Sequence, residues 1–155
     1  MRVKNKVIVG ISCGDINGIG LEVLINSFAV EKLFDRCIPV LYVPVKIIKS
    51  YLRALKIKDF EFHVIKNPKD ALMYKMNIID FAAKDMHLSL GESTNFAAQI
   101  AVDSLNFGVG DLKKNLTDVL LTLPVNKHNI SLVKKDFVGH TEFLSKKFDN
   151  KKNLM

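Results

Sequence analysis

The stretch from Lys6 to Leu24, KVIVGISCGDINGIGLEVL, constrains the fold more than any other part of this chain. Its apolar, β-branched run at 7–11 is typical of a strand that is buried on both faces. A glycine-rich turn follows, and a helix is predicted to begin at about Leu21. A strand, a turn of this kind and a helix begin most α/β ligand-binding domains. The glycines let the backbone approach a ligand, and the helix N-terminus offers N–H groups to an anion.

The glycine spacing in this turn fits neither familiar nucleotide-binding pattern. Gly14, Gly18 and Gly20 do not form GxGxxG, and no Gly-Lys-Ser/Thr sequence follows them, so a P-loop is excluded. Taken by itself, the turn is equally consistent with a structural connection between a strand and a helix.

The charge of the chain favours anionic small molecules over nucleic acid as ligands. The 155 residues are 48% hydrophobic and 25% charged, which is enough for one globular domain with a core. The net charge of +7 is carried by single and paired lysines without interleaved aromatic residues. We therefore expect a solvated lysine-rich surface and no nucleic-acid partner.

Cysteine usage and hydropathy point to a cytoplasmic protein. Cys13 and Cys37 are too few for a disulfide framework and their spacing suits no zinc motif, so we expect reduced, buried thiols. No apolar segment approaches the ~20 residues that span a bilayer, so no membrane partner is expected. The N-terminal apolar run is too short for a signal peptide.

The rest of the chain alternates between predicted helices and strands. Helices are predicted at 21–33, 45–55 and 93–107, and strands at 38–43, 60–65, 77–81 and 119–122. This order favours an α/β fold with a mainly parallel sheet flanked by helices. We expect Val23, Leu24 and Phe28 to face the core, and Gly108 to stop the third helix. The alternating pattern at 60–65 predicts that His63 points outward.

A second motif follows the apolar strand at 119–122. The sequence Leu123-Pro124-Val125-Asn126-Lys127 forms the loop after this strand, which is where open α/β sheets bind ligands. Lys127 could meet a phosphate or a carboxylate there as a point charge. A surface lysine is an equally good interpretation, and the adjacent His128 is expected to face away.

A third motif is Val138-Gly139-His140-Thr141-Glu142-Phe143-Leu144. A helix is predicted to begin at His140 and Thr141 and to run through Phe148. This would bring an imidazole, a hydroxyl and helix N–H groups to one ligand-facing point. Glu142 in the first turn suits the helix dipole, and the His-Thr pair could also be purely structural.

Together the three motifs resemble the N-terminal half of the 4-hydroxythreonine-4-phosphate dehydrogenase family of pyridoxal 5'-phosphate biosynthesis. The turn GDINGIGLE at 14–22 is similar to the family's GDPAGIGPE and departs from it at Ile16, Asn17 and Leu21. The sequence TLPVNK at 122–127 resembles the family's T-A/G-P-I/V-N/H-K loop, and GHTEF at 139–143 matches without change. The motifs occur in family order and nearly span residues 1–155.

The resemblance implies an isocitrate/isopropylmalate dehydrogenase-like fold, with two α/β domains around a cleft, in a homodimer. It implies oxidation of 4-phosphooxy-L-threonine by NAD or NADP, followed by decarboxylation to 3-amino-2-oxopropyl phosphate. A divalent metal (Zn, Mg or Co) would polarise the hydroxyl and then the keto oxygen. By position, His140 and Thr141 match the family's substrate-binding pair, and Asp15 and Lys127 are weaker candidates for the same cleft.

Family members are longer than this chain, and their metal-binding histidines lie in the half that has no counterpart here. His63, His87 and His128 match none of those ligands. We therefore expect residues 1–155 to be the N-terminal portion of a truncated two-domain dehydrogenase, inactive alone. Two alternatives stay open: a related dehydrogenase of a phosphorylated four-carbon sugar acid such as 4-phospho-erythronate, and a non-catalytic assembly module that pairs with another chain.

Overall fold

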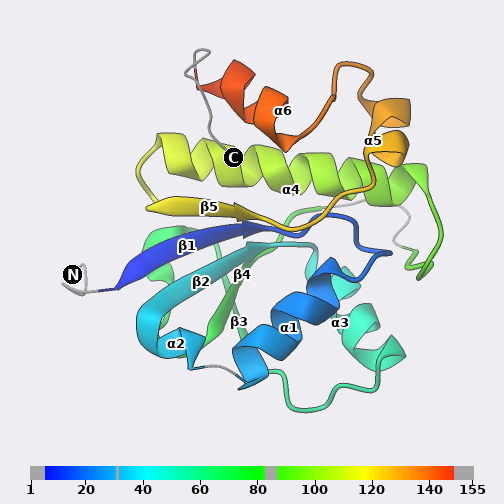
Figure 1. The fold of residues 1–155 in the computed structure, drawn as a ribbon. Coiled ribbons are helices and arrows are strands. Elements are labelled where there is room, and N and C mark those ends of the chain that lie inside the picture. Colours follow the sequence, from blue (N-terminus) through cyan, green and yellow to red (C-terminus); the bar gives the residue numbers. More distant parts are fainter. Residues whose placement is uncertain (1–5, 31, 83–86, 149–155) are drawn as a thin grey trace.

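A single parallel sheet forms the centre of the molecule (Figure 1). The structure, a computed structural model, describes residues 6–30, 32–82 and 87–148. Within them the strands are β1 (Val7–Ser12), β2 (Cys37–Tyr42), β3 (Phe62–Ile65), β4 (Met76–Ile79) and β5 (Val119–Thr122). They are arranged in the order β3-β4-β2-β1-β5, and each neighbouring pair is parallel. The predicted α/β class with a parallel sheet is confirmed.

Helices cover both faces of this sheet (Figure 1). Helices α1 (Gly20–Val30), α2 (Leu33–Arg36) and α3 (Val45–Ala54) lie on one face, and α4 (Asn95–Lys113), α5 (Lys127–Val133) and α6 (His140–Lys147) lie on the other. A short 3-10 helix, η1 (Pro68–Asp70), precedes β4. In the described ranges, no helix combines the length and the apolarity needed to cross a membrane.

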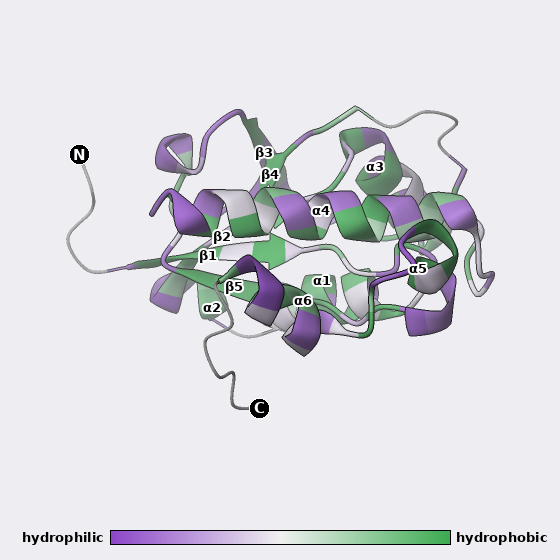
Figure 2. Ribbon diagram, turned by 90° about the horizontal axis from the view of Figure 1, so that it is seen from above, coloured by the Kyte–Doolittle hydropathy of each residue, from purple (hydrophilic) through white to green (hydrophobic). Residues whose placement is uncertain are grey.

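Each face of the sheet has its own apolar core. The larger core joins α1 and α3 to the central strands, and it includes Ile11, Leu41 and Ile78. A second cluster joins α4, α5 and α6 and includes Val102, Ile130 and Phe143. Seen from above in Figure 2, α4 lies along the sheet and its hydrophobic and hydrophilic residues alternate around the helix.

Strand register brings the candidate motifs to one edge of the sheet. Ser12, the last residue of β1, pairs with Tyr42 at the end of β2 and with Thr122 at the end of β5. Because these strands are parallel, the loops that follow β1 and β5 leave the sheet side by side. Ligands of open α/β sheets bind outside this carboxyl edge.

The first predicted helix is shorter than expected, and one of its residues faces the other way. Helix α1 ends at Val30, and Leu33 begins the separate helix α2. Val23 is 54% exposed, whereas Leu24 and Phe28 are buried. At about 100° per residue, Val23 lies on the side of the helix opposite Leu21, so it cannot share the buried stripe. The prediction for Val23 was wrong.

Gly108 does not stop the third predicted helix, because α4 continues through it to Lys113. The residue is buried in the helix, where α4 passes over β5. A Cβ atom at this position would lie 2.6 Å from Cδ1 of Leu120. The glycine therefore permits close packing of helix on strand and is not a helix cap.

Candidate functional site

The turn after β1 packs directly on the loop after β5. The backbone N–H of Asp15 donates a 2.9 Å hydrogen bond to the carbonyl of Pro124. Gly14 has φ +61°, and a Cβ there would collide with the Pro124 carbonyl oxygen and lie 2.8 Å from that of Leu123. Only glycine fits this position, because both the backbone conformation and the close approach exclude a side chain.

The side chain of Asn17 forms hydrogen bonds that hold the same turn against the segment before α4. Its side chain is 3% exposed, and Nδ2 donates to the carbonyl of Glu92 at 2.9 Å and to Oγ1 of Thr94 at 3.2 Å. Its Oδ1 accepts from the N–H of Ser89 at 3.0 Å. Asn17 is one of the positions where the turn departs from the family motif. In this chain the asparagine at that position forms hydrogen bonds that connect the turn to residues 89–94.

Two further side-chain amides tie the loop after β5 to the start of α4. Asn126 caps α5 by accepting from the N–H of Asn129, and its Nδ2 donates to Oγ of Ser93 at 2.9 Å. Nδ2 of Asn129 donates to the carbonyl of Thr94 at 2.7 Å. Thr94 in turn caps α4 by accepting from the N–H of Ala97 at 3.1 Å. The N-terminal ends of α4 and α5 are therefore held in fixed relation to the first turn.

Lys127 and His140 are the first residues of α5 and α6, and the Lys127 side chain reaches Gly139, which precedes His140. A Cβ atom at Gly139 would lie 3.6 Å from both Cε and Nζ of Lys127, and 2.9 Å from Oε2 of Glu142. The Lys127 ammonium group therefore lies beside the N-terminus of α6. This is an unfavourable place for a cation alone, because the helix dipole is positive there. The Glu142 carboxylate, whose Oε2 reaches the same point, offsets part of this positive charge, so a bound anion would be attracted by Lys127 and the helix N-terminus and repelled by Glu142.

His140 is half-buried, with its ring edge-on to Phe137 at a centroid distance of 6.1 Å. Among the described residues its buried Nε2 has no hydrogen-bond partner. Burial lowers the pKa of this imidazole, and the positive charge of Lys127 lowers it further. The ring is therefore neutral at pH 7. Thr141 follows it in the first turn of α6 and is also partly buried.

The three motifs predicted from sequence thus form a connected series. The first contacts the second through Gly14, Asp15 and Pro124, and the second contacts the third through Lys127 and Gly139. The side-chain hydrogen bonds of Asn17 and Asn129 were not predicted, because their partners lie 72–77 and 35 residues away in sequence and no local pattern marks them.

The other histidines and the cysteines stand apart from this site. His63, His87 and His128 are exposed, as predicted for His63 and His128. Both cysteines are free; Cys13 is buried, whereas Cys37 is only partly buried. Burial raises the pKa of the Cys13 thiol to about 12. Within the ranges that the structure describes, no group of three or more His, Cys, Asp or Glu side chains could hold a metal ion, so these residues do not fit a metal site.

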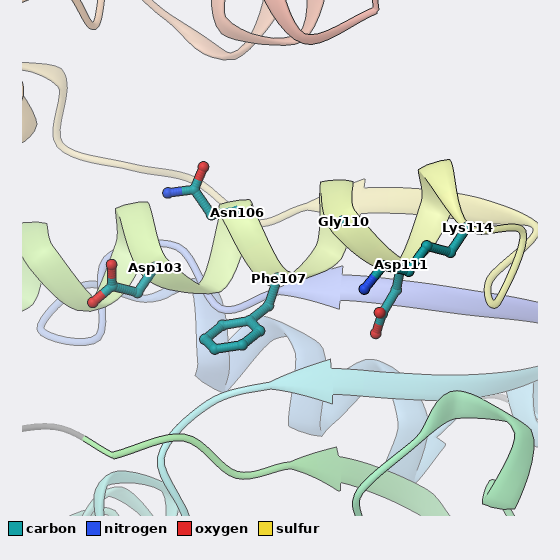
Figure 3. A pocket seen from close by; sticks show the side chains of 6 residues that line it. All are labelled: Asp103, Asn106, Phe107, Gly110, Asp111 and Lys114. Atoms are coloured by element: carbon teal, nitrogen blue, oxygen red, sulfur yellow. The ribbon is translucent and has the colours of Figure 1, made fainter.

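A shallow groove of about 340 Å³ lies elsewhere, along α4 (Figure 3). It is lined by Asp103, Asn106, Phe107, Gly110, Asp111 and Lys114. Asp111 is already engaged, because it accepts a 2.9 Å hydrogen bond from the hydroxyl of Tyr42. None of the three motifs contributes a residue to this groove.

Comparison with known proteins decides the family. The family model described as pyridoxal phosphate biosynthetic protein PdxA matches residues 35–155. The chain belongs to this family. The 4-hydroxythreonine-4-phosphate dehydrogenase of Bacteroides thetaiotaomicron is 28% identical over 153 residues, covering 98% of this chain and 42% of the relative. A Clostridium botulinum protein provisionally named D-threonate 4-phosphate dehydrogenase is 26% identical over 146 residues, covering 92% and 43%.

Solved structures of PdxA relatives confirm the isocitrate/isopropylmalate dehydrogenase-like fold. The Klebsiella pneumoniae 4-hydroxythreonine-4-phosphate dehydrogenase superposes with a TM-score of 0.82 at 24% identity, covering 94% of this chain and 45% of that one. The Burkholderia phymatum enzyme gives 0.83 at 21% identity, covering 96% and 46%. The chain therefore spans less than half the length of the PdxA relatives that it matches.

Proposed function

We propose that this chain supplies the substrate-holding part of a dehydrogenase that acts on 4-phosphooxy-L-threonine. The reaction is its NAD- or NADP-dependent oxidation and decarboxylation to 3-amino-2-oxopropyl phosphate, in pyridoxal 5'-phosphate biosynthesis. The observation that carries the proposal is that the side chain of Lys127, which follows β5, reaches Gly139 at the start of α6, next to His140. The family motifs thus contact one another, although they are far apart in sequence.

The chemistry of this point suits a phosphorylated hydroxy acid. Lys127 and the N-terminus of α6 together provide positive charge and N–H donors for a phosphate or carboxylate oxygen. Nε2 of His140 is buried, so only when this point opens to the substrate can it accept a hydrogen bond from a substrate hydroxyl or, in the other tautomer, donate one to an oxyanion. The Thr141 hydroxyl adds a second polar group beside it. Their role is to orient the substrate, which hydride transfer and decarboxylation both require.

A nicotinamide cofactor and a divalent metal belong to the proposed reaction. A bound metal would supply Lewis-acid stabilisation of the developing oxyanion. The described residues do not fit a metal site, so we assign the metal ligands and most of the cofactor site to the part of the family proteins that this chain does not cover. A homodimer of the complete two-domain protein, located in the cytoplasm, is part of the same proposal.

A second substrate is favoured by one of the comparisons. The Clostridium botulinum relative is named for D-threonate 4-phosphate, a phosphorylated four-carbon sugar acid. It shares the phosphate, the carboxylate and the C3 hydroxyl with 4-phosphooxy-L-threonine but carries a hydroxyl where that substrate has an amine. Lys127 and His140 could hold the shared groups of either molecule, so comparing the two substrates directly decides between them.

The test is kinetic, in a protein that joins this segment to the remainder of the family fold. His140→Ala is expected to lower kcat/KM on the better substrate by on the order of 100-fold, because the transition state loses an oriented partner. His128→Ala is the matched control: it removes an exposed imidazole at the same edge, and kcat/KM should stay unchanged. An unchanged kcat/KM for His140→Ala removes this residue from the site.

The 155-residue chain alone is expected to show no NAD-dependent turnover with either substrate, even with added Zn²⁺ or Mg²⁺. The reason is that its described residues offer no metal site. Turnover by the purified chain would refute the assignment of the metal and cofactor groups to the remaining part of the fold.

A further inference from the structure

Helix α6 begins without the side-chain cap that its neighbours have. Thr94 and Asn126 cap α4 and α5 by accepting hydrogen bonds from backbone N–H groups in the first turn of each helix. The residue at the same position of α6 is Gly139, which has no side chain to do this. The first N–H groups of a helix have no partner inside it and carry a partial positive charge. At α6 an acceptor for them has to come from another residue, from water or from a ligand.

Glu142 brings a carboxylate to this point. It is the third residue of α6, the position from which a glutamate side chain commonly turns back toward the start of its own helix. Its Oε2 lies 2.9 Å from the place that a Cβ atom of Gly139 would occupy. The missing side chain of Gly139 therefore makes room for the carboxylate, because a Cβ atom there would press against it.

The ammonium group of Lys127 reaches the same point from α5. Its Nζ is 3.6 Å from the same Cβ position, so the ammonium and the Glu142 carboxylate lie within about 7 Å of each other. Both side chains are exposed, so water and salt weaken their interaction without removing it. An anion that binds to Lys127 and the start of α6 thus enters a place where one negative charge is already present.

We propose that Glu142 is an internal competitor for the anion that Lys127 and the start of α6 bind. In the empty site its carboxylate offsets part of the positive charge, so a ligand must displace this carboxylate or bind against its repulsion. The repulsion is greater for a doubly charged anion than for a singly charged one. Glu142 thereby sets how strongly the site selects its ligand by charge. This inference rests on the anion-binding role of Lys127 in the proposed function.

The size of the effect follows from charge and distance. In water, one charge about 6 Å away changes the affinity for a monoanion by about 3-fold, and that for a dianion, which feels twice the energy, by about 10-fold. Glu142→Gln keeps the length of the side chain and removes its charge. At pH 8, where inorganic phosphate is mainly a dianion, this variant should bind acetate about 3-fold and phosphate about 10-fold more tightly than the unchanged chain. Salt at about 1 M should remove most of the difference.

The test titrates the 155-residue chain with inorganic phosphate, and separately with acetate, at low ionic strength. The backbone amide signals of 139–142 report binding by NMR. Glu142→Asp keeps the charge but is one methylene shorter, so it should bind phosphate more tightly than the unchanged chain and less tightly than Glu142→Gln. Asp136→Asn is the matched control, because it removes one exposed negative charge from the loop before α6. Its affinity for phosphate should change far less than that of Glu142→Gln.

Thermal unfolding separates this role from helix capping. A carboxylate that only stabilises α6 would lower Tm when it is replaced by Gln but would leave phosphate affinity unchanged. That result overturns the proposal, as does an equal gain in affinity for phosphate and acetate, an equal gain in Asp136→Asn, or a Glu142→Asp variant that binds no more tightly than the unchanged chain.

Lys127→Met distinguishes failure of this inference from failure of the proposed function. It should bind phosphate at least 10-fold more weakly than the unchanged chain, because the cation that attracts the anion is gone. If Lys127→Met loses binding but Glu142→Gln changes nothing, only the competitor role of Glu142 is refuted. If Lys127→Met binds as tightly as the unchanged chain, or if neither the unchanged chain nor Glu142→Gln binds phosphate, the anion site at Lys127 is refuted as well.

Discussion

Replacing Gly14 by alanine tests whether the first turn is built on its contact with the loop after β5. Two costs add at this position. An alanine at φ +61° pays on the order of 1 kcal/mol for a left-handed conformation. Its Cβ would also collide with the carbonyl oxygens of Pro124 and Leu123, which belong to the backbone and cannot rotate away.

The two segments must therefore separate, and the hydrogen bond from the Asp15 N–H to Pro124 weakens or breaks. That loss costs about 1 kcal/mol, and the lost packing adds about as much again. We expect Gly14→Ala to lower the free energy of unfolding by about 3 kcal/mol in total. For a domain of this size the fall in Tm would be roughly 6–12 °C.

Gly91→Ala is the matched control. Gly91 also has a positive φ, +80°, but a Cβ there meets no atom within 4 Å. Its cost should be the conformational part alone, about 1 kcal/mol. Urea unfolding followed by circular dichroism measures both variants. If Gly14→Ala costs no more than Gly91→Ala, the close contact between the turn and the loop does not contribute to stability.

Three further predictions follow from burial and backbone geometry. Cys13, whose pKa burial raises to about 12, should resist Ellman's reagent at pH 8 in the folded chain, while the half-buried Cys37 reacts first; equal rates would contradict this. The His140 imidazole should titrate below 6.5 by NMR and move upward in Lys127→Met. Because the pKa of His140 is lower in the folded than in the unfolded chain, the unfolded state binds more protons between these two pKa values. The free energy of unfolding should therefore rise with pH up to about 6.5. Gly110→Ala, inside α4 with open space around it, should stabilise the chain by about 0.5–1 kcal/mol in thermal unfolding, and a lower Tm would count against it.

Local chemistry made most of the fold predictable. The strand at 7–11, the turn after it and the helix start at His140 each depend on neighbouring residues, so their sequence patterns are sufficient. Gly108 shows where this fails. A glycine inside an apolar stripe can end a helix or admit a close neighbour, and the neighbour that decides, Leu120, lies on another element. The sequence contains both residues but not their contact.

Lys127 shows what the fold adds to the candidate site. From the sequence alone, Lys127 could be a surface lysine or an anion ligand, since residues of both kinds occur in loops that follow strands. The structure leaves its side chain exposed but directs the ammonium group to the start of α6, beside an imidazole that burial already keeps neutral. A lysine whose only role is to be solvated at the surface gains no electrostatic stabilisation from lying at the positive end of a helix dipole. Glu142 Oε2 reaches the same point and already supplies one negative charge there, so the geometry is consistent with a structural pairing of Lys127 as well as with the proposed binding of an anionic ligand.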